Sequence, residues 1–123
     1  MTKRLTVTDV IIIPDKEVQF KLDSQDSLND LKPSGQMLVD SEGLSFIYLL
    51  ENEEAYTYIS VPDTVWSSLK EVISNSLAVV VINGGERLLL PQFQEELEYL
   101  IDNIKGNSNY GEKMMNKVEA VFG

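Results

Sequence analysis

The sequence contains no cysteine and no histidine. It therefore lacks the thiolate nucleophile, the side chain most often used as a general base near neutral pH, both usual zinc ligands and any means of forming a disulfide bond. Oxygen ligands remain, but the cluster of Asp23, Asp26 and Asp30 lacks the spacing of an EF-hand, and residues 40–43 are typical of a turn between strands. We expect no metal site and no cofactor.

Long apolar runs are also missing. No stretch approaches the roughly 20 apolar residues that a helix needs to cross a bilayer, and the run after Arg4 is interrupted by Thr6, Thr8 and Asp9. No small-residue cleavage site follows Ile13, so the opening residues do not match a secretory signal. We expect no membrane binding and a cytoplasmic location.

Basic side chains are scarce, with ten Lys and Arg against twenty Asp and Glu, for a formal net charge of −10. The basic residues are scattered, whereas nucleic acids and anionic membranes require clustered Lys and Arg. We expect no nucleic acid binding, and any macromolecular partner should present a basic or apolar protein surface. The 43% hydrophobic content is enough for a core, and the 123 residues suit a single globular domain over residues 1–123.

Residues 36–40, 44–51 and 55–61 predict three successive strands joined by short polar turns. The middle run is apolar on both alternating faces except at Ser45, which is typical of a strand covered on each side. This strand should be central in a sheet. Residues 5–13 and 18–22 predict one hairpin, and residues 78–82 and 86–90 predict another around Asn83, Gly84 and Gly85.

Three helices are predicted from apolar stripes. The first begins at Pro62 and carries Trp66 in its buried stripe, the second begins at Pro91 and ends at Gly106, and the third runs from near Asn109 to Phe122. Because the loops have hairpin length, the sequence predicts an α+β fold, with an antiparallel sheet of six to seven strands and three principal helices. The last two helices should form a helical hairpin packed on the sheet.

The connection at residues 106–111 is the most unusual local sequence. Gly106 should end one helix, Asn109 should cap the next and Tyr110 should pack beneath the turn. In that arrangement Asn107 and Ser108 point outward, and they are our candidate partner-binding residues. A purely structural turn is the alternative.

Two weak motif matches were rejected, and no catalytic residue is assigned. Ser67 and Lys70 have S-x-x-K spacing, but the companion motifs of the penicillin-recognising enzymes are absent. Gly106 and Gly111 have the spacing of P-loop glycines, but Glu112 stands where the phosphate-binding lysine is required. We therefore expect no nucleotide site.

Four segments resemble a known family: GQMLVDSEGLSFIYLLE from Gly35, AYTYI from Ala55, EELEYL from Glu95 and NIKGNSNYGEKM from Asn103. They are similar to the YjbL-like family of small uncharacterised proteins from Gram-positive bacilli. The resemblance covers most of the chain after Ser27 and implies a bacterial cytoplasmic protein without an assigned activity.

Two functions from different classes fit these observations. The first is a non-enzymatic protein-interaction or regulatory module, which the missing catalytic residues and the surface charge favour. The second is a small enzyme that uses carboxylate, Tyr or Ser chemistry in a cleft on the sheet. A pocket with converging carboxylates of perturbed pKa would indicate the enzyme, and an apolar patch with an acidic rim would indicate the module.

Overall fold

The computed structural model describes residues 3–23, 27–28, 30–53 and 55–123 of the chain. Asp26 of the predicted acidic cluster lies outside this part. The strands are β1 (Lys3–Ile13), β2 (Glu17–Leu22), β3 (Lys32–Asp40), β4 (Ser45–Glu51), β5 (Tyr56–Pro62), β6 (Ala78–Asn83) and β7 (Glu86–Leu89). The helices are α1 (Trp66–Asn75), α2 (Phe93–Ile104) and α3 (Glu112–Phe122), with short 3-10 helices η1 (Asp63–Val65) and η2 (Ser108–Tyr110).

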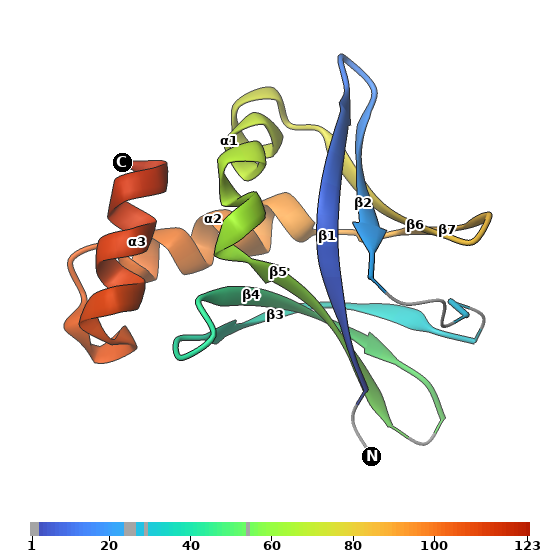
Figure 1. The fold of residues 1–123 in the computed structure, drawn as a ribbon, viewed down its shortest axis with the longest axis horizontal. Coiled ribbons are helices and arrows are strands. Elements are labelled where there is room, and N and C mark those ends of the chain that lie inside the picture. The colour runs from blue at the N-terminus through green and yellow to red at the C-terminus, as the bar shows by residue number, and fades with distance from the viewer. Residues whose placement is uncertain (1–2, 24–26, 29, 54) are drawn as a thin grey trace.

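The strands form a single seven-stranded sheet with the order β3-β4-β5-β1-β2-β6-β7 (Figure 1). Its parts are the predicted meander β3-β4-β5 and the two predicted hairpins, β1-β2 and β6-β7. The first hairpin is inserted between the meander and the second hairpin. As expected, β4 is not at an edge and is paired on both sides, but it is the second strand of the sheet and not the central one.

The prediction of an antiparallel sheet is only partly right, because the sheet is mixed. β1 pairs in parallel with β5, and β2 pairs in parallel with β6, while the other neighbours are antiparallel. A tight loop determines the direction of the two strands that it joins. The two parallel junctions instead join strands that are distant in the sequence, so no hairpin loop specifies their direction.

Strand β3 begins at Lys32, four residues before the predicted start. Lys32, Pro33, Ser34 and Gly35 resemble a loop in composition, but β3 is an edge strand, where a proline is tolerated because one side of the strand makes no sheet hydrogen bonds. The register shifts between Pro33 and Met37, and Gly35 within this irregularity has φ 76°, a conformation that favours glycine.

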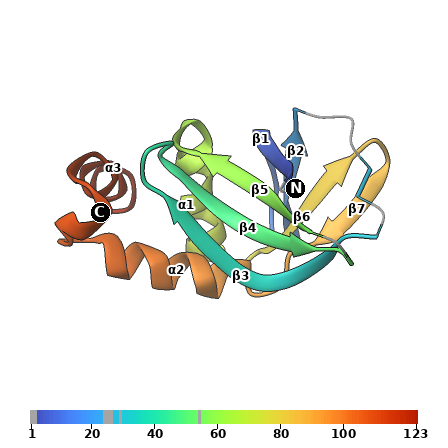
Figure 2. The same cartoon turned by 90° about the horizontal axis from the view of Figure 1, so that it is seen from below.

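The sheet curls into a half-barrel; α1 and α2 pack against it, whereas α3 lies beyond one end of the sheet and packs on these two helices (Figure 2). The core combines the inward side chains of the strands with one stripe from each helix. From the helices these are Trp66, Leu69, Val72, Phe93, Leu97, Ile101, Ile104, Met114 and Val118.

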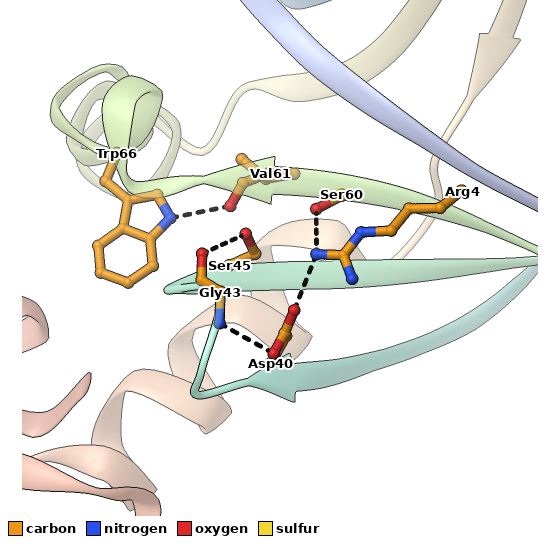
Figure 3. A network of polar contacts seen from close by, with 7 residues as sticks. All are labelled: Arg4, Asp40, Gly43, Ser45, Ser60, Val61 and Trp66. Carbon is orange, nitrogen blue, oxygen red and sulfur yellow. Dashed lines mark hydrogen bonds and ion pairs between the residues drawn. The ribbon is translucent and has the colours of Figure 1, made fainter. Parts of the chain in front are cut away.

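Trp66 is fully buried, as predicted. Its indole Nε1 donates a hydrogen bond to the Val61 carbonyl at 3.0 Å (Figure 3), and its ring lies 4.8 Å from that of Phe46. Phe122 at the end of α3 packs against both rings, at 6.3 Å from Phe46 and 6.1 Å from Trp66. The aromatic group therefore connects the sheet, α1 and α3.

Tyr48 connects the two ends of the curled sheet. Its hydroxyl donates to the Pro91 carbonyl at 2.7 Å and accepts from the Gly35 N–H at 3.2 Å. Gly35 belongs to edge strand β3, and Pro91 follows edge strand β7. Burial raises the pKa of the Tyr48 phenol, so the hydroxyl remains a neutral donor at physiological pH.

α2 and α3 follow each other across a short connection, as predicted, but each helix begins later than predicted. α1 begins at Trp66 because Pro62 ends β5 and η1 intervenes, α2 begins at Phe93 rather than Pro91, and α3 begins at Glu112 rather than near Asn109. Figure 1 shows its axis running across that of α2, so the two helices do not form the antiparallel helical hairpin that the sequence predicted. In the described part of the chain, no helix is long and apolar enough to span a membrane.

Candidate functional site

A groove of about 450 Å³ lies where α1, α2 and the end of α3 meet. Its apolar part consists of Ile73, Ile101 and Phe122, one residue from each helix. Ile73 is at the margin of the stripe that α1 buries against the sheet, so it remains half-buried and faces the neighbouring helices. We call this region the helix groove.

Polar and charged side chains form the rest of the helix groove. They are Lys70 and Ser74 from α1, Glu98 and Asp102 from α2, and Lys105 just after α2. The ion pairs found among the described residues lie elsewhere, at Arg4–Asp40, Arg87–Glu17 and Lys117–Asp63. The groove thus combines apolar surface with charged side chains that do not take part in those three ion pairs.

The exposed face of α2 extends the groove and is acidic. The helix carries four carboxylates and no basic residue, and Glu95, Glu98 and Asp102 lie on its outward half. Tyr99 lies between them in the sequence and is 66% exposed, more than any other large hydrophobic side chain that the structure describes. An exposed aromatic ring among carboxylates is suited to contacts with a cationic partner.

The predicted partner-binding residues lie beyond the end of the groove, in the connection after Lys105. Ser108 is exposed, whereas the side chain of Asn107 is engaged locally. Its Oδ1 accepts from the Asn109 N–H at 3.1 Å, and its Nδ2 donates to the Asn103 carbonyl at 3.2 Å. The structure does not bring Asn107 or Ser108 into the lining of the groove.

The prediction that Asn109 caps the third helix is wrong. The capping side chain in this connection is Asn107, which caps η2, and the residue before α3 is Gly111, with φ 93°. The sequence did not indicate η2, whose extra turn displaces the helix start by three residues. Gly106 has the predicted left-handed conformation, with φ 68°.

The residues of the helix groove were not predicted from the sequence as a site. The apolar periodicity of α1 and α2 placed Ile73 and Ile101 in buried stripes, which is correct for each helix alone. The groove forms where α1, α2 and the end of α3 meet, with Ile101 buried beneath it and Ile73 partly exposed. The only local signal was Tyr99, an aromatic residue outside the apolar stripe of α2.

The convex face of the sheet carries a polar network around Arg4. Its Nη2 donates at 2.9 Å to both Asp40 Oδ2 and Ser60 Oγ (Figure 3). To reach Asp40 on β3, the side chain passes from β1 over β5 and β4, which explains why the outward-facing Ile47 of β4 is buried. Hydrogen bonds from the Gly43 N–H and from Arg4 lower the pKa of Asp40.

A second arginine makes a similar contact at the other end of the convex face. From β7, Arg87 Nη1 donates to Glu17 Oε2 at 2.6 Å, and Nη2 donates to Oε1. The side chain crosses β6, where the outward-facing Val80 is only 1% exposed. These bonds, with a third from Gln19, lower the pKa of Glu17 to about 2. Both arginines of the sequence thus cover an aliphatic side chain and bind a carboxylate.

Comparisons with known proteins identify the family. A family model described as a family of unknown function, UPF0738, matches residues 5–122. The chain is 37% identical over 122 residues to the UPF0738 protein YjbL of Bacillus subtilis (strain 168), covering 99% of each chain. It is 38% identical to a UPF0738 protein of Bacillus pumilus (strain SAFR-032) with the same coverage.

A UPF0738 protein of Bacillus cereus (strain G9842) is 41% identical over 95 residues, which cover 77% of each chain. No solved structure matches the chain. The resemblance to YjbL-like proteins of bacilli is therefore confirmed, and it extends to the N-terminal strands as well. The chain belongs to the UPF0738 family, a family of unknown function.

Proposed function

We propose that this protein is a non-enzymatic interaction module of the cytoplasm, and that its helix groove binds a segment of a partner protein. The segment presents an apolar side chain to Ile73, Ile101 and Phe122 and carries basic residues beside it. The observation behind this proposal is the position of an open apolar groove next to the acidic face of α2.

Charge complementarity determines the chemistry of the partner. The chain has a net charge of −10, and α2 adds four carboxylates beside the groove without a compensating base within the helix. A cationic segment is therefore attracted over long range, and this attraction weakens as salt is added. Lys70 and Lys105 on the groove also allow the segment to carry one acidic residue.

The apolar part of the groove supplies the anchor. Binding hot spots are typically apolar or aromatic side chains in pockets from which surrounding contacts exclude water. Ile101 is buried and Phe122 is held in place by Phe46 and Trp66, so the floor of the groove is preformed. A preformed floor lowers the ordering cost of binding.

The pKa shifts support an interaction module over the alternative enzyme. They occur at Glu17, Asp40, Tyr48 and Arg87. The causes are the two arginine contacts of the convex face and the burial of Tyr48 in the core, and these groups come from separate parts of the fold. Catalytic acids and bases with shifted pKa values usually converge in one cleft.

A displayed library of random peptides, selected on the immobilised protein, tests the proposal. We expect the enriched peptides to contain an apolar residue flanked by Lys or Arg. Binding of a purified enriched peptide, followed by fluorescence anisotropy, should weaken strongly in the Glu98→Lys/Asp102→Lys variant. It should also weaken as salt is raised.

The matched control is the Glu42→Lys/Glu53→Lys variant, because these two carboxylates are exposed in turns of the sheet. Each double variant changes the net charge from −10 to −6, so a general charge effect would be equal in both. Circular dichroism tests whether both variants are folded. Equal loss of binding in the two variants, or enrichment of acidic peptides, would contradict the proposal.

A further inference from the structure

The two long walls of the helix groove carry opposite charge. Residues spaced i, i+3 and i+4 share one face of a helix, and both walls have this spacing: Lys70, Ile73 and Ser74 on α1, and Glu98, Ile101 and Asp102 on α2. The central isoleucine of each wall belongs to the apolar floor. The flanking groups are hydrogen-bond donors on α1 and carboxylates on α2, and Lys105 adds a second cation after the end of α2.

The charged side chains of the helix groove are two cations and two carboxylates, namely Lys70, Lys105, Glu98 and Asp102. Among the residues that the structure describes, none of these four side chains takes part in an ion pair or a hydrogen bond. Opposite charges that line one groove without pairing remain available to a ligand. A ligand that satisfies all four carries an anion and a cation close to an apolar group.

We propose that the segment bound in the helix groove is the C-terminal end of the partner protein. This inference rests on the proposed function and names the part of the partner that binds. The terminal carboxylate contacts the two lysines, and the last side chain is apolar and lies on the floor. Basic residues earlier in the segment contact the two carboxylates of α2.

A chain end brings an anion and an apolar side chain into one small site, because both are bonded to the same Cα atom. An internal Asp or Glu does this less well. In an extended segment neighbouring side chains point to opposite faces, so an acidic neighbour points away from the apolar anchor. A helical segment is about 10 to 12 Å across, whereas the helix groove, at about 450 Å³, is a small site.

An N-terminal amine fits the groove less well than a C-terminal carboxylate. The amine would pair with Glu98 and Asp102, but it would bring no anion to Lys70 and Lys105 and would be repelled by them. A terminal carboxylate is ionised at neutral pH. It accepts several hydrogen bonds, so the two ammonium groups and the Ser74 hydroxyl form a matching set of donors.

The test compares two forms of one synthetic peptide. The probe is the fluorescein-labelled peptide Gly-Lys-Gly-Lys-Gly-Leu, made with a free C-terminal carboxylate and with a C-terminal amide, and its binding is followed by fluorescence anisotropy. The label blocks the N-terminal amine, so the two forms differ only at the C-terminus. We expect the amide to bind about tenfold more weakly, because charge-assisted hydrogen bonds are lost. Long-range attraction alone predicts the opposite, since the amide is more cationic and the protein has a net charge of −10.

The Lys70→Gln/Lys105→Gln variant tests the two lysines. It should bind the free-acid peptide about tenfold more weakly and should bind the amide no more weakly than the unmodified protein does. The matched control is Lys16→Gln/Lys113→Gln, because these two lysines are exposed and lie outside the groove. Each double variant changes the net charge from −10 to −12. In the control, the affinities for the two peptides should change by the same factor.

The outcomes separate this inference from the proposed function. An amide that binds as well as the free acid would overturn the inference, as would equal weakening of both peptides by the Lys70→Gln/Lys105→Gln variant. If such binding still required Glu98 and Asp102, the proposed function would stand. If neither peptide binds, or if Glu98→Lys/Asp102→Lys leaves binding unchanged, both proposals are wrong.

Discussion

The guanidinium of Arg87 binds the carboxylate of Glu17, which lies 70 positions earlier in the chain, by reaching across β6. The contact joins the edge strand β7 to β2 on the convex face and shields Val80. The contact also lowers the pKa of Glu17 to about 2. Among the described residues, Glu17 should therefore contribute most to the change of folding stability with pH.

We expect the Glu17 contribution to stability to be lost in acid. A carboxyl group whose folded pKa is about 2, against an ordinary value of 4.5, stabilises the fold fully above pH 4.5 and loses this effect as pH falls through about 2. Urea unfolding between pH 7 and pH 2 measures the free energy of unfolding of the unmodified protein and of Glu17→Gln. The difference between these two free energies should narrow in acid. The control is Glu95→Gln, an exposed residue outside the ion pairs, which should show a much smaller gap. A Glu17 gap independent of pH would contradict the assignment.

Tyr48→Phe should destabilise the fold by about 1 to 3 kcal/mol, since the Gly35 N–H and the Pro91 carbonyl each lose a partner in a partly buried site. Hydrogen exchange at Gly35 should accelerate together with the loss of stability. Tyr99→Phe is the matched control, because that ring is exposed. Equal stabilities of the two variants would show that the hydroxyl bridge is not formed.

Trp66→Ala should cost about 3 to 5 kcal/mol, the usual range for deleting a buried aromatic side chain. The indole fills the space between Phe46 and Phe122 and donates a hydrogen bond to Val61. Thermal unfolding followed by circular dichroism measures the effect. An unchanged melting temperature would be incompatible with a buried Trp66.

Replacing each of the two asparagines in the connection between α2 and α3 should change the stability of the fold by different amounts. Asn107→Ala removes the cap of η2 and should cost about 0.5 to 2 kcal/mol, whereas Asn109→Ala should change stability by less than about 0.5 kcal/mol. Urea unfolding measures the two free-energy changes. The sequence alone predicted the larger loss for Asn109→Ala, because Asn109 was expected to be the cap. Ser108→Ala should leave folding unchanged, so reduced peptide binding in that variant would assign Ser108 to recognition.

We expect no nucleic acid binding at physiological salt. Fluorescence anisotropy with labelled double-stranded DNA and single-stranded RNA of mixed sequence measures it, with a known basic DNA-binding protein as the positive control. The ten excess negative charges repel phosphates, and the two arginines are already paired with carboxylates. Submicromolar binding of either probe would contradict the electrostatic argument.

The elements of the fold were predictable because each follows from a local pattern. Alternating apolar residues gave the strands, apolar stripes gave the helices, and Asn83 with Gly84 gave the last hairpin. The burial of Trp66 followed from its place in the stripe of α1. The interior position of β4 followed from apolar residues on both faces, although Ile47 is covered by an arginine and not by a second layer of structure.

The parallel junctions and the helix groove were not predictable by the same means. Pairing of β1 with β5 and of β2 with β6 depends on packing between distant segments, which no loop between them encodes. The groove depends on the angle at which α3 crosses α2. η2 precedes α3, and Phe122 at the end of α3 contacts Trp66; neither feature is visible in the periodicity of the sequence.

The insertion of the β1-β2 hairpin between the meander and the last hairpin has a consequence for biosynthesis. β1 leaves the ribosome first, yet its partner β5 begins at Tyr56, and the partner of β2 begins at Ala78. The sheet cannot close until most of the chain has been made, and such non-local pairing slows folding because a long loop must be closed first. Both outer edges of the first hairpin therefore lack their sheet partners until β5 and β6 have been made, and unpaired strand edges favour aggregation.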